Sequence, residues 1–305
     1  KINTERDLLR RLSKSPVDIY VEFITLDTRK SSRVCNNYID VYYETFSNLK
    51  KNTLSNDNFN KKNSSCCKNF NTKNFDKTDF DKTDFDELDL NTRSFNKKDF
   101  NKSDLNTRSF NRKDFDGIII TGAPIEEIEF EEVDYWNELC DFIDYAEENS
   151  NSVLFICWAA QAALYKKYKI NKRKLKEKCF GVFSHNILTN NKILENINDG
   201  FFAPHSRHTY ININDIKKQP ELELVSVSDF AGAYIIADKK NIYVTGHGEY
   251  DKYTLDKEYK RDIENGKHIQ LPQNYYKNNN VDEEPEDRWK ETSEQFFLNL
   301  IKYKF

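Results

Sequence analysis

The chain has 305 residues, a length that allows about two domains or one large α/β domain with an insertion. Its 47 Lys and Arg residues nearly balance its 51 Asp and Glu residues, which argues against nucleic acid as an electrostatic partner. No run of about 18 apolar residues is present, which argues against a membrane-spanning helix.

The cysteines indicate the cellular compartment, and the first residues indicate how the chain begins. None of the six cysteines forms a Cys-x-x-C pair, so we expect no zinc site and no disulfide framework, but reduced thiols in a cytoplasmic protein. The chain contains no Met and begins at Lys1, so we expect it to lack its true N-terminus.

Residues 1–50 form the first part of a predicted α/β domain. The spacing of Leu8, Leu9 and Leu12 predicts a helix over 3–12, with the three side chains on one face. Alternation of apolar and polar residues over 17–26 predicts a strand.

Residues 51–113 form an insertion rich in Asn, Lys, Asp and Phe, in which a Phe or Leu recurs at every fifth position from Phe70 onward. This period resembles pentapeptide repeats, which stack into a four-sided β-helix. In that coil the residue two positions before the Phe also points inward, and here it is often Lys or Arg, whose burial is costly. We therefore favour a low-complexity, disordered insertion over the β-helix.

The remainder, 114–305, alternates between predicted strands and helices. Buried strands are expected over 116–122 and 152–156, helices over 130–146 and 158–168, and a strand hairpin over 233–237 and 241–245. This alternation predicts a mostly parallel sheet with helices on both faces. Ligands then bind at the carboxyl ends of the strands.

Cys157 is the sharpest candidate for chemistry. It ends a buried strand and directly precedes a helix, the arrangement of a nucleophile elbow. A helix N-terminus favours the thiolate. The alternative is a buried structural cysteine, the usual fate of Cys in apolar surroundings.

A second candidate is the segment TGHGEY (245–250), in which His247 and Glu249 follow a predicted strand. His247 can deprotonate Cys157, and Glu249 can orient the imidazole. The pair is a weak pattern by itself, but the order Cys, His, Glu at strand ends matches a class I glutamine amidotransferase-like, or flavodoxin-like, architecture. A third candidate, FFAPHSRH (201–208), is expected to form a polar turn or a solvated loop.

Four motifs then resemble the homoserine O-acyltransferases of the amidotransferase-like type. They are TGAPIE (121–126) with FEEVDYW (130–136), CWAAQA (157–162), APHSRH (203–208) and TGHGEYD (245–251). The resemblance covers about 1–50 and 114–305. It implies one catalytic α/β domain, interrupted by the insertion, that moves an acyl group from acyl-CoA to the hydroxyl of L-homoserine in methionine biosynthesis.

The resemblance also assigns roles. Cys157 matches the nucleophile that carries the acyl group as a thioester, His247 the general base and Glu249 its partner. Lys178, Ser206 and Arg261 match positions that contact the substrate. L-homoserine and acetyl-CoA are the implied substrates. We expect no cofactor, since acetyl-CoA acts as a co-substrate, no membrane or nucleic-acid partner, and we leave a homodimer open.

Glu126 matches the family position that separates acetyl from succinyl donors. Members with Glu there resemble acetyltransferases, and a carboxylate in an acyl pocket repels the second carboxylate of a succinyl group. The sequence therefore predicts acetyl-CoA, with a succinyl-CoA-using homologue as the alternative.

Two departures from the family pattern keep further alternatives open. Gly248 stands where the family usually has Pro and loosens the turn that holds Glu249. The family's first strand would precede Lys1. The alternatives are a truncated non-catalytic relative, a glutamine amidotransferase or related hydrolase, and an interaction module in which the insertion binds a partner.

Overall fold

The computed structural model describes residues 2–17, 19, 21, 24–26, 44–47, 49–50 and 115–305. The chain divides into two units, one made of 1–46 with 113–305 and the other of 47–112. All described residues except 47, 49 and 50 belong to the first unit. The insertion predicted over 51–113 lies outside the described residues, so the division into 1–50, 51–113 and 114–305 stays a prediction.

The N-terminal segment contains the predicted helix but little of the predicted strand. Helix α1 spans Ile2–Leu12. In the range 17–26, the only described residues in a strand are those of β1 (Ile24–Thr25), which pairs in parallel with β2 (Glu44–Thr45). Val17 is 57% exposed and Val21 37%. At the described residues 17, 19 and 21 the predicted strand is therefore wrong, because an alternating pattern makes a strand only where one face is buried.

A mixed sheet of seven strands is the centre of the described structure. Its order is β3-β4-β9-β8-β7-β5-β6. The strands are β3 (Phe115–Ile120), β4 (Ser150–Ile156), β5 (Lys172–Ile187), β6 (Phe201–Ile211), β7 (Glu223–Ser228), β8 (Gly232–Ala237) and β9 (Ile242–Val244).

The pairing of neighbouring strands changes from parallel to antiparallel at β9. Strands β3, β4 and β9 run parallel, with Ile120 beside Phe155 and Ile156 beside Val244. Beyond β9 each pairing is antiparallel, and of these the sequence predicted only the β8–β9 hairpin. The carboxyl ends of β4 and β9 therefore meet at one edge of the sheet, where residues 157 and 247 follow.

The helices predicted over 3–12, 130–146 and 158–168 are present, whereas the helices after residue 168 were not predicted. Helix α6 spans Trp158–Tyr168, as expected, while the helix predicted over 130–146 begins with a 3₁₀ turn, η4 (Phe130–Glu132), before α5 (Trp136–Asn149). The others are η5 (Lys192–Leu194), α7 (Ile213–Lys217), α8 (Thr254–Glu264), η6 (Lys277–Asn279) and α9 (Lys290–Tyr303). Within the ranges that the structure describes, no helix is both long and apolar enough to cross a bilayer.

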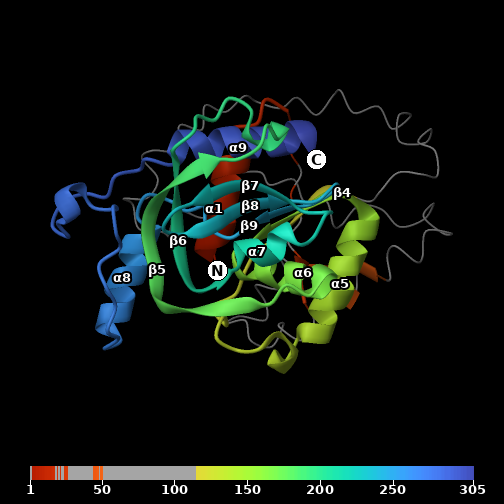
Figure 1. Ribbon diagram of the computed structural model, residues 1–305, viewed down its shortest axis with the longest axis horizontal. Coiled ribbons are helices and arrows are strands. Elements are labelled where there is room, and N and C mark those ends of the chain that lie inside the picture. The colour runs from red at the N-terminus through yellow and green to blue at the C-terminus, as the bar shows by residue number, and fades with distance from the viewer. Residues whose placement is uncertain are drawn as a thin grey trace, which may run out of the picture. The chain divides into compact units, whose positions relative to one another are not determined.

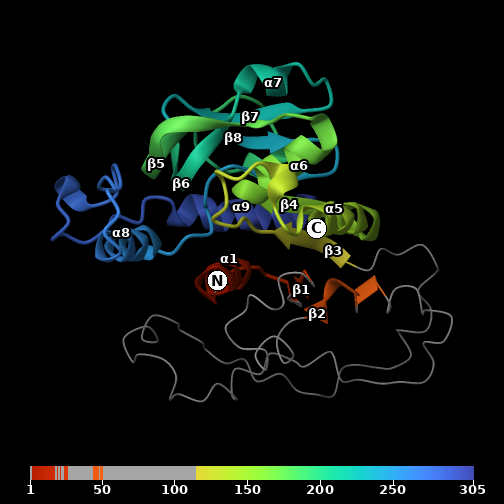
Figure 2. The same cartoon turned by 90° about the horizontal axis from the view of Figure 1, so that it is seen from below.

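Helices cover both faces of the sheet, which confirms the predicted α/β fold. Leu154 and Ile156 of β4 pack in one apolar cluster with leucines of α1 and with Phe297 of α9. Phe155 points to the opposite face, where α6 packs, and stacks on Tyr243 of β9 with 5.2 Å between ring centroids. In Figure 1, α9 lies along one side of the strands and α5 and α6 along the other. Figure 2 shows α8 beside the ends of β5 and β6, far from α5.

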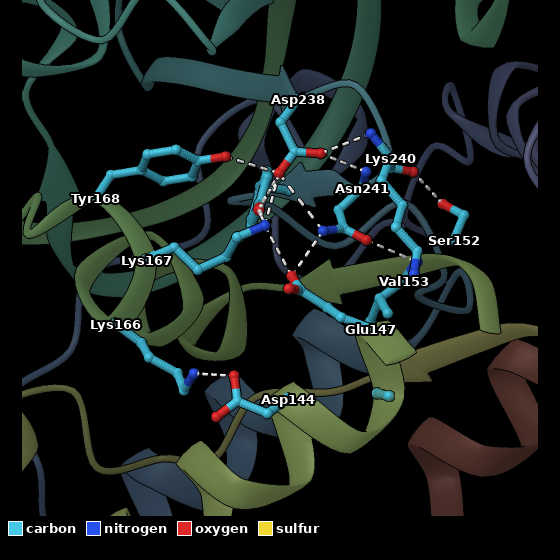
Figure 3. Close-up of polar contacts among 12 residues, drawn as sticks. Asp144, Glu147, Ser152, Val153, Lys166, Lys167, Tyr168, Asp238, Lys240 and Asn241 are labelled. Atoms are coloured by element: carbon cyan, nitrogen blue, oxygen red, sulfur yellow. Dashed lines mark hydrogen bonds and ion pairs between the residues drawn. The ribbon is translucent and has the colours of Figure 1, made fainter. Parts of the chain in front are cut away.

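A partly buried polar network fixes the start of β9 at the edge opposite Cys157 (Figure 3). The Asp238 carboxylate accepts hydrogen bonds from Lys167 Nζ at 2.8 Å and from the Tyr243 hydroxyl at 2.7 Å. Asn241 Nδ2 donates to Glu147 of α5 at 2.7 Å. Burial opposes ionisation of Asp238, but these donors lower its pKa below the usual value. The network ties the β8–β9 hairpin to α5 and α6 and so holds β9 in place beside β4.

Candidate active site

Cys157 forms a sharp turn between β4 and α6. Its φ and ψ are 55° and −121°, and such a positive φ is strained for a residue with a side chain. Its N–H donates to the Val244 carbonyl at 2.7 Å, so the pairing of β4 with β9 continues into the turn. The strand–Cys–helix turn predicted from the sequence is present, and Cys157 is 5% exposed.

The end of β3 approaches this turn closely. A Cβ atom on Gly122 would lie 2.9 Å from the Trp158 backbone nitrogen and 3.2 Å from the Ile156 carbonyl oxygen. No side chain fits there, so the glycine is required by close backbone approach. Trp158 is the first residue of α6, where a backbone N–H has no acceptor within the helix. This N–H is available to an oxyanion formed on a group attached to Cys157.

His247 lies at the carboxyl end of β9 and joins Cys157 to Glu249. His247 Nδ1 is 2.7 Å from Glu249 Oε1, and its imidazole lies close enough to Cys157 for that group to raise the imidazole pKa. Burial by itself lowers the pKa of His247, but its polar neighbours Cys157 and Glu249 raise it well above the usual value. The arrangement favours the imidazolium form of His247.

Strand β6 and helix α9 hold the turn that carries His247. The His247 N–H donates to the Pro204 carbonyl at 2.8 Å, and Ser293 Oγ of α9 donates to the Gly248 carbonyl. Glu249 is 2% exposed. The glycine at position 248 therefore does not prevent His247 and Glu249 from pairing.

The segment 201–208 is a buried strand, β6, and the predicted turn is wrong. His205 is 0% and Arg207 2% exposed. Antiparallel pairing with β5 satisfies the backbone, and the buried polar side chains of β6 have hydrogen-bond partners. His205 Nε2 lies 3.0 Å from His185 Nε2, and Arg207 Nη1 donates to the Thr209 carbonyl at 2.7 Å. Burial lowers the pKa of both histidines, that of His185 to about 3, so both are neutral.

Lys178, Ser206 and Arg261 come from three separate elements and meet around Glu258 of α8. Lys178 Nζ is 2.5 Å from Glu258 Oε1, and Ser206 Oγ donates to the same oxygen at 2.7 Å. Arg261 Nη2 lies 4.0 Å from it and 2.8 Å from Asp262 Oδ1. The cluster holds both cations and carboxylates, which suits a substrate that carries an ammonium and a carboxylate.

Sequence reasoning missed Glu258. One signal was present, since it precedes Arg261 by three residues and so shares a helix face with it. The contact with Lys178 and Ser206 depends on how α8 packs beside β5 and β6, which no local pattern shows.

Glu126 follows β3 and reaches β6. Its Oε2 accepts a hydrogen bond from the His208 N–H at 2.5 Å. His208 is two residues from Ser206, so the structure brings this carboxylate to the strand that contributes to the Glu258 cluster.

Comparison with known proteins identifies a matching family, several relatives and solved structures of similar fold. The chain matches the model of a family described as homoserine O-succinyltransferase over residues 1–56 and 85–305. It is 37% identical over 306 residues to a homoserine O-acetyltransferase of Clostridium acetobutylicum, covering 99% of this chain and 81% of the relative. A homoserine O-acetyltransferase of Clostridium tetani is 38% identical over 308 residues, with coverage of 99% and 81%. A solved glutamine amidotransferase from Thermotoga maritima has a TM-score of 0.47 and 15% identity, covering 61% of this chain and 76% of that chain.

Proposed function

Because the chain belongs to the homoserine O-succinyltransferase family, we propose that it is a homoserine O-acetyltransferase that carries the acetyl group as a thioester on Cys157. It transfers the group from acetyl-CoA to the hydroxyl of L-homoserine, an early step of methionine biosynthesis. The observation that carries the proposal is the Cys157–His247–Glu249 arrangement, in which His247 Nδ1 lies 2.7 Å from Glu249 and Cys157 is close enough to the imidazole to raise its pKa.

The first half-reaction loads the enzyme. The Cys157 thiolate attacks the carbonyl carbon of acetyl-CoA, and a new C–S bond forms while the oxyanion is held by the Trp158 N–H. The bond to the CoA sulfur then breaks, and the His247 imidazolium gives its proton to the leaving thiolate. Free CoA, a neutral His247 and an acetyl thioester on Cys157 result.

The second half-reaction returns the enzyme to its starting state. The homoserine hydroxyl gives its proton to His247 as its oxygen attacks the thioester carbonyl. The C–S bond to Cys157 breaks, which restores the thiolate beside a protonated His247. O-acetyl-L-homoserine leaves.

The Glu258 cluster supplies the chemistry that the acceptor needs. The Glu258 carboxylate suits the α-ammonium of homoserine, and the Arg261 guanidinium suits its α-carboxylate in a bidentate contact. Lys178 and Ser206 already bond Glu258 at 2.5 and 2.7 Å, and so fix the position of its carboxylate.

The acetyl donor is supported by two independent observations. The relatives reported above are acetyltransferases, although the family description names the succinyl group. Glu126 adds a charge argument: we infer that its carboxylate, which binds the His208 N–H, faces the acyl group, where it repels a succinyl carboxylate and leaves an acetyl group unaffected.

Single-turnover acylation read by intact mass tests the proposal. The protein is mixed with acetyl-CoA or succinyl-CoA, and the adduct is followed before and after addition of homoserine. We expect an acetyl adduct on the wild type that disappears on adding homoserine, and none on Cys157→Ser. Cys179→Ser, which removes a buried cysteine of β5, is the matched control and should still load.

Other results would change the conclusion in defined ways. A succinyl adduct in place of the acetyl one contradicts the Glu126 argument and keeps the family. Absence of any adduct on folded protein contradicts the acyltransferase proposal itself. Release of ammonia from glutamine under the same conditions would favour the amidotransferase alternative.

A further inference from the structure

Tyr250 lies directly on the imidazole of His247. The two ring centroids are 4.1 Å apart and the ring planes differ by 13°, which is a face-to-face stack. Neither the family resemblance nor the proposed mechanism gives this tyrosine a role. The contact matters because the flat face of an aromatic ring attracts a cation, and the mechanism needs His247 in its protonated form during the first half-reaction.

The backbone of Tyr250 is held from two other parts of the chain. Its carbonyl accepts a hydrogen bond from Arg11 Nη2 of α1 at 2.8 Å and one from Trp289 Nε1 at 2.9 Å. Both side chains are buried, with Arg11 3% and Trp289 1% exposed. The Tyr250 N–H donates to the His247 carbonyl at 3.2 Å. The ring is therefore fixed over the imidazole by anchors at its own main chain.

The phenol is neutral in these surroundings. Burial raises the pKa of Tyr250 well above its usual value, and nearby negative groups raise it further. A neutral ring presents its negative face to His247 without adding a full charge. The groups around the phenol are Glu249, Glu258 of α8, Cys157 and Asp7 of α1.

The other groups that face His247 are accounted for. Cys157 and Glu249 favour the imidazolium, and His205 of β6, which opposes it when charged, is kept neutral by burial. An effect of the Tyr250 ring is therefore added to a known set of charges and can be isolated by changing the ring alone.

We propose that Tyr250 is a positioning residue that holds the His247 imidazole in plane and stabilises its protonated form through the stacked ring. Its main chain is anchored by Arg11 and Trp289, so α1 takes part in ordering the catalytic turn. This inference rests on the proposed role of His247.

The test reads His247 directly and does not depend on either substrate. The chain has five histidines, so ¹³C-labelled histidine gives few NMR signals, and His247 is identified by its loss in His247→Gln. We expect Tyr250→Leu to lower the pKa of His247 by about half a unit to one unit. Tyr250→Phe keeps the ring and should leave that pKa where it is in the wild type.

A control and a second ring variant separate an effect on the His247 pKa from a general loss of stability. Tyr276→Leu removes a buried tyrosine ring from the neighbouring apolar cluster and should lower the melting temperature without moving the His247 titration. If Tyr250→Leu does not fold, pentafluorophenylalanine at Tyr250 keeps the shape of the ring and reverses the charge of its face, and it should also lower the pKa.

Two results would overturn the inference. One is an unchanged His247 pKa in both Tyr250→Leu and the fluorinated variant. The other is an equal drop in Tyr250→Phe, which would assign the effect to the hydroxyl. Failure of acetyl transfer with the pKa shift intact would contradict the proposed function and leave this inference standing.

Discussion

Asp7 shows how one residue behind the catalytic turn carries an electrostatic cost. It is 3% exposed, and its carboxylate accepts hydrogen bonds from Thr254 Oγ1 and Arg10 Nη1, each at 3.2 Å. Burial raises its pKa to about 6; Arg10 opposes the rise, and Asp251 and Glu249 add to it. The folded state therefore binds a proton at Asp7 more tightly than the unfolded state, in which the pKa is near 3.8.

Asp7→Asn is expected to stabilise the protein at pH 8 by about 2–3 kcal/mol, because it removes a buried charge whose folded pKa is raised. The stability contribution of the proton on Asp7 is complete below about pH 3.8 and is lost as the pH rises through about 6. The gain from the substitution should therefore be nearly constant from pH 8 down to about the folded pKa of 6, and should shrink as the pH falls further toward 3.8. Urea unfolding across this range measures it.

Asp229→Asn is the matched control for this measurement, since Asp229 is exposed in the β7–β8 turn. It should change the free energy of unfolding little at any pH. A loss of stability in Asp7→Asn at pH 8 would show that the ionised carboxylate is net favourable where it lies.

For single residues, the sequence identified the candidate reacting groups but not the residues that hold them in place. Cys157, His247 and Glu249 stand at strand ends or just after them, where position alone indicates access to ligands. Glu258 and Tyr250 carry no such signal. Each is defined by a partner far along the chain, Ser206 in one case and Arg11 in the other.

At the scale of elements, the packing of β6 against the catalytic turn distinguishes the two glycines beside His247. A Cβ on Gly246 would lie 2.8 Å from the Pro204 carbonyl oxygen and 2.8 Å from His205 Cε1. A Cβ on Gly248 would lie 3.3 Å from the Tyr234 hydroxyl and 3.7 Å from Ser293 Oγ. The first neighbours belong to a paired strand and cannot yield, whereas the second are side-chain hydroxyls.

Gly246→Ala should therefore slow acetylation of Cys157 by about 100-fold or more, because a displacement of His247 by about 1 Å is costly. Gly248→Ala should stay within about threefold of the wild type, as a tighter turn costs little where space exists. Rapid-quench acylation followed by mass spectrometry measures both rates, and circular dichroism checks the fold. Equal rates in the two variants would contradict the role given to β6.

Some helices and strands were predicted close to their observed bounds, and others were not. Helices α1 and α6 and strands β4, β8 and β9 were expected nearly at their observed bounds, because periodic apolar patterns report a buried face directly. Strand β6 was mistaken for a turn. Its Pro, His, Ser and Arg residues look solvated in sequence. The His205 and Arg207 side chains are buried only because His185 and the backbone carbonyls of Thr209 and Ala231 satisfy them.

For the molecule as a whole, the proposed activity belongs to one unit. Every residue assigned to the site lies in 113–305, and the family model matches 1–56 and 85–305 but not the stretch between. Replacing 57–84 by a short Gly-Ser linker is therefore expected to leave kcat/KM for acetyl transfer within about threefold, because the catalytic contacts are untouched.

Steady-state kinetics on the linker variant checks this, with two linker lengths to separate strain from loss of the segment. A folded variant that binds both substrates and loses more than about tenfold in rate with either linker would favour the interaction-module interpretation. The segment would then contribute to function directly.

Local periodicity and long motifs in the sequence were enough to predict the α/β class, the family and the order of Cys157, His247 and Glu249. The tertiary structure decided how far the sheet is antiparallel, where β6 is buried and which groups support the catalytic turn. The physical reason is that these last features are contacts between segments as distant as Arg11 and Tyr250. Such contacts form only when α1 and α8 pack against the sheet, and no pattern along one segment encodes them.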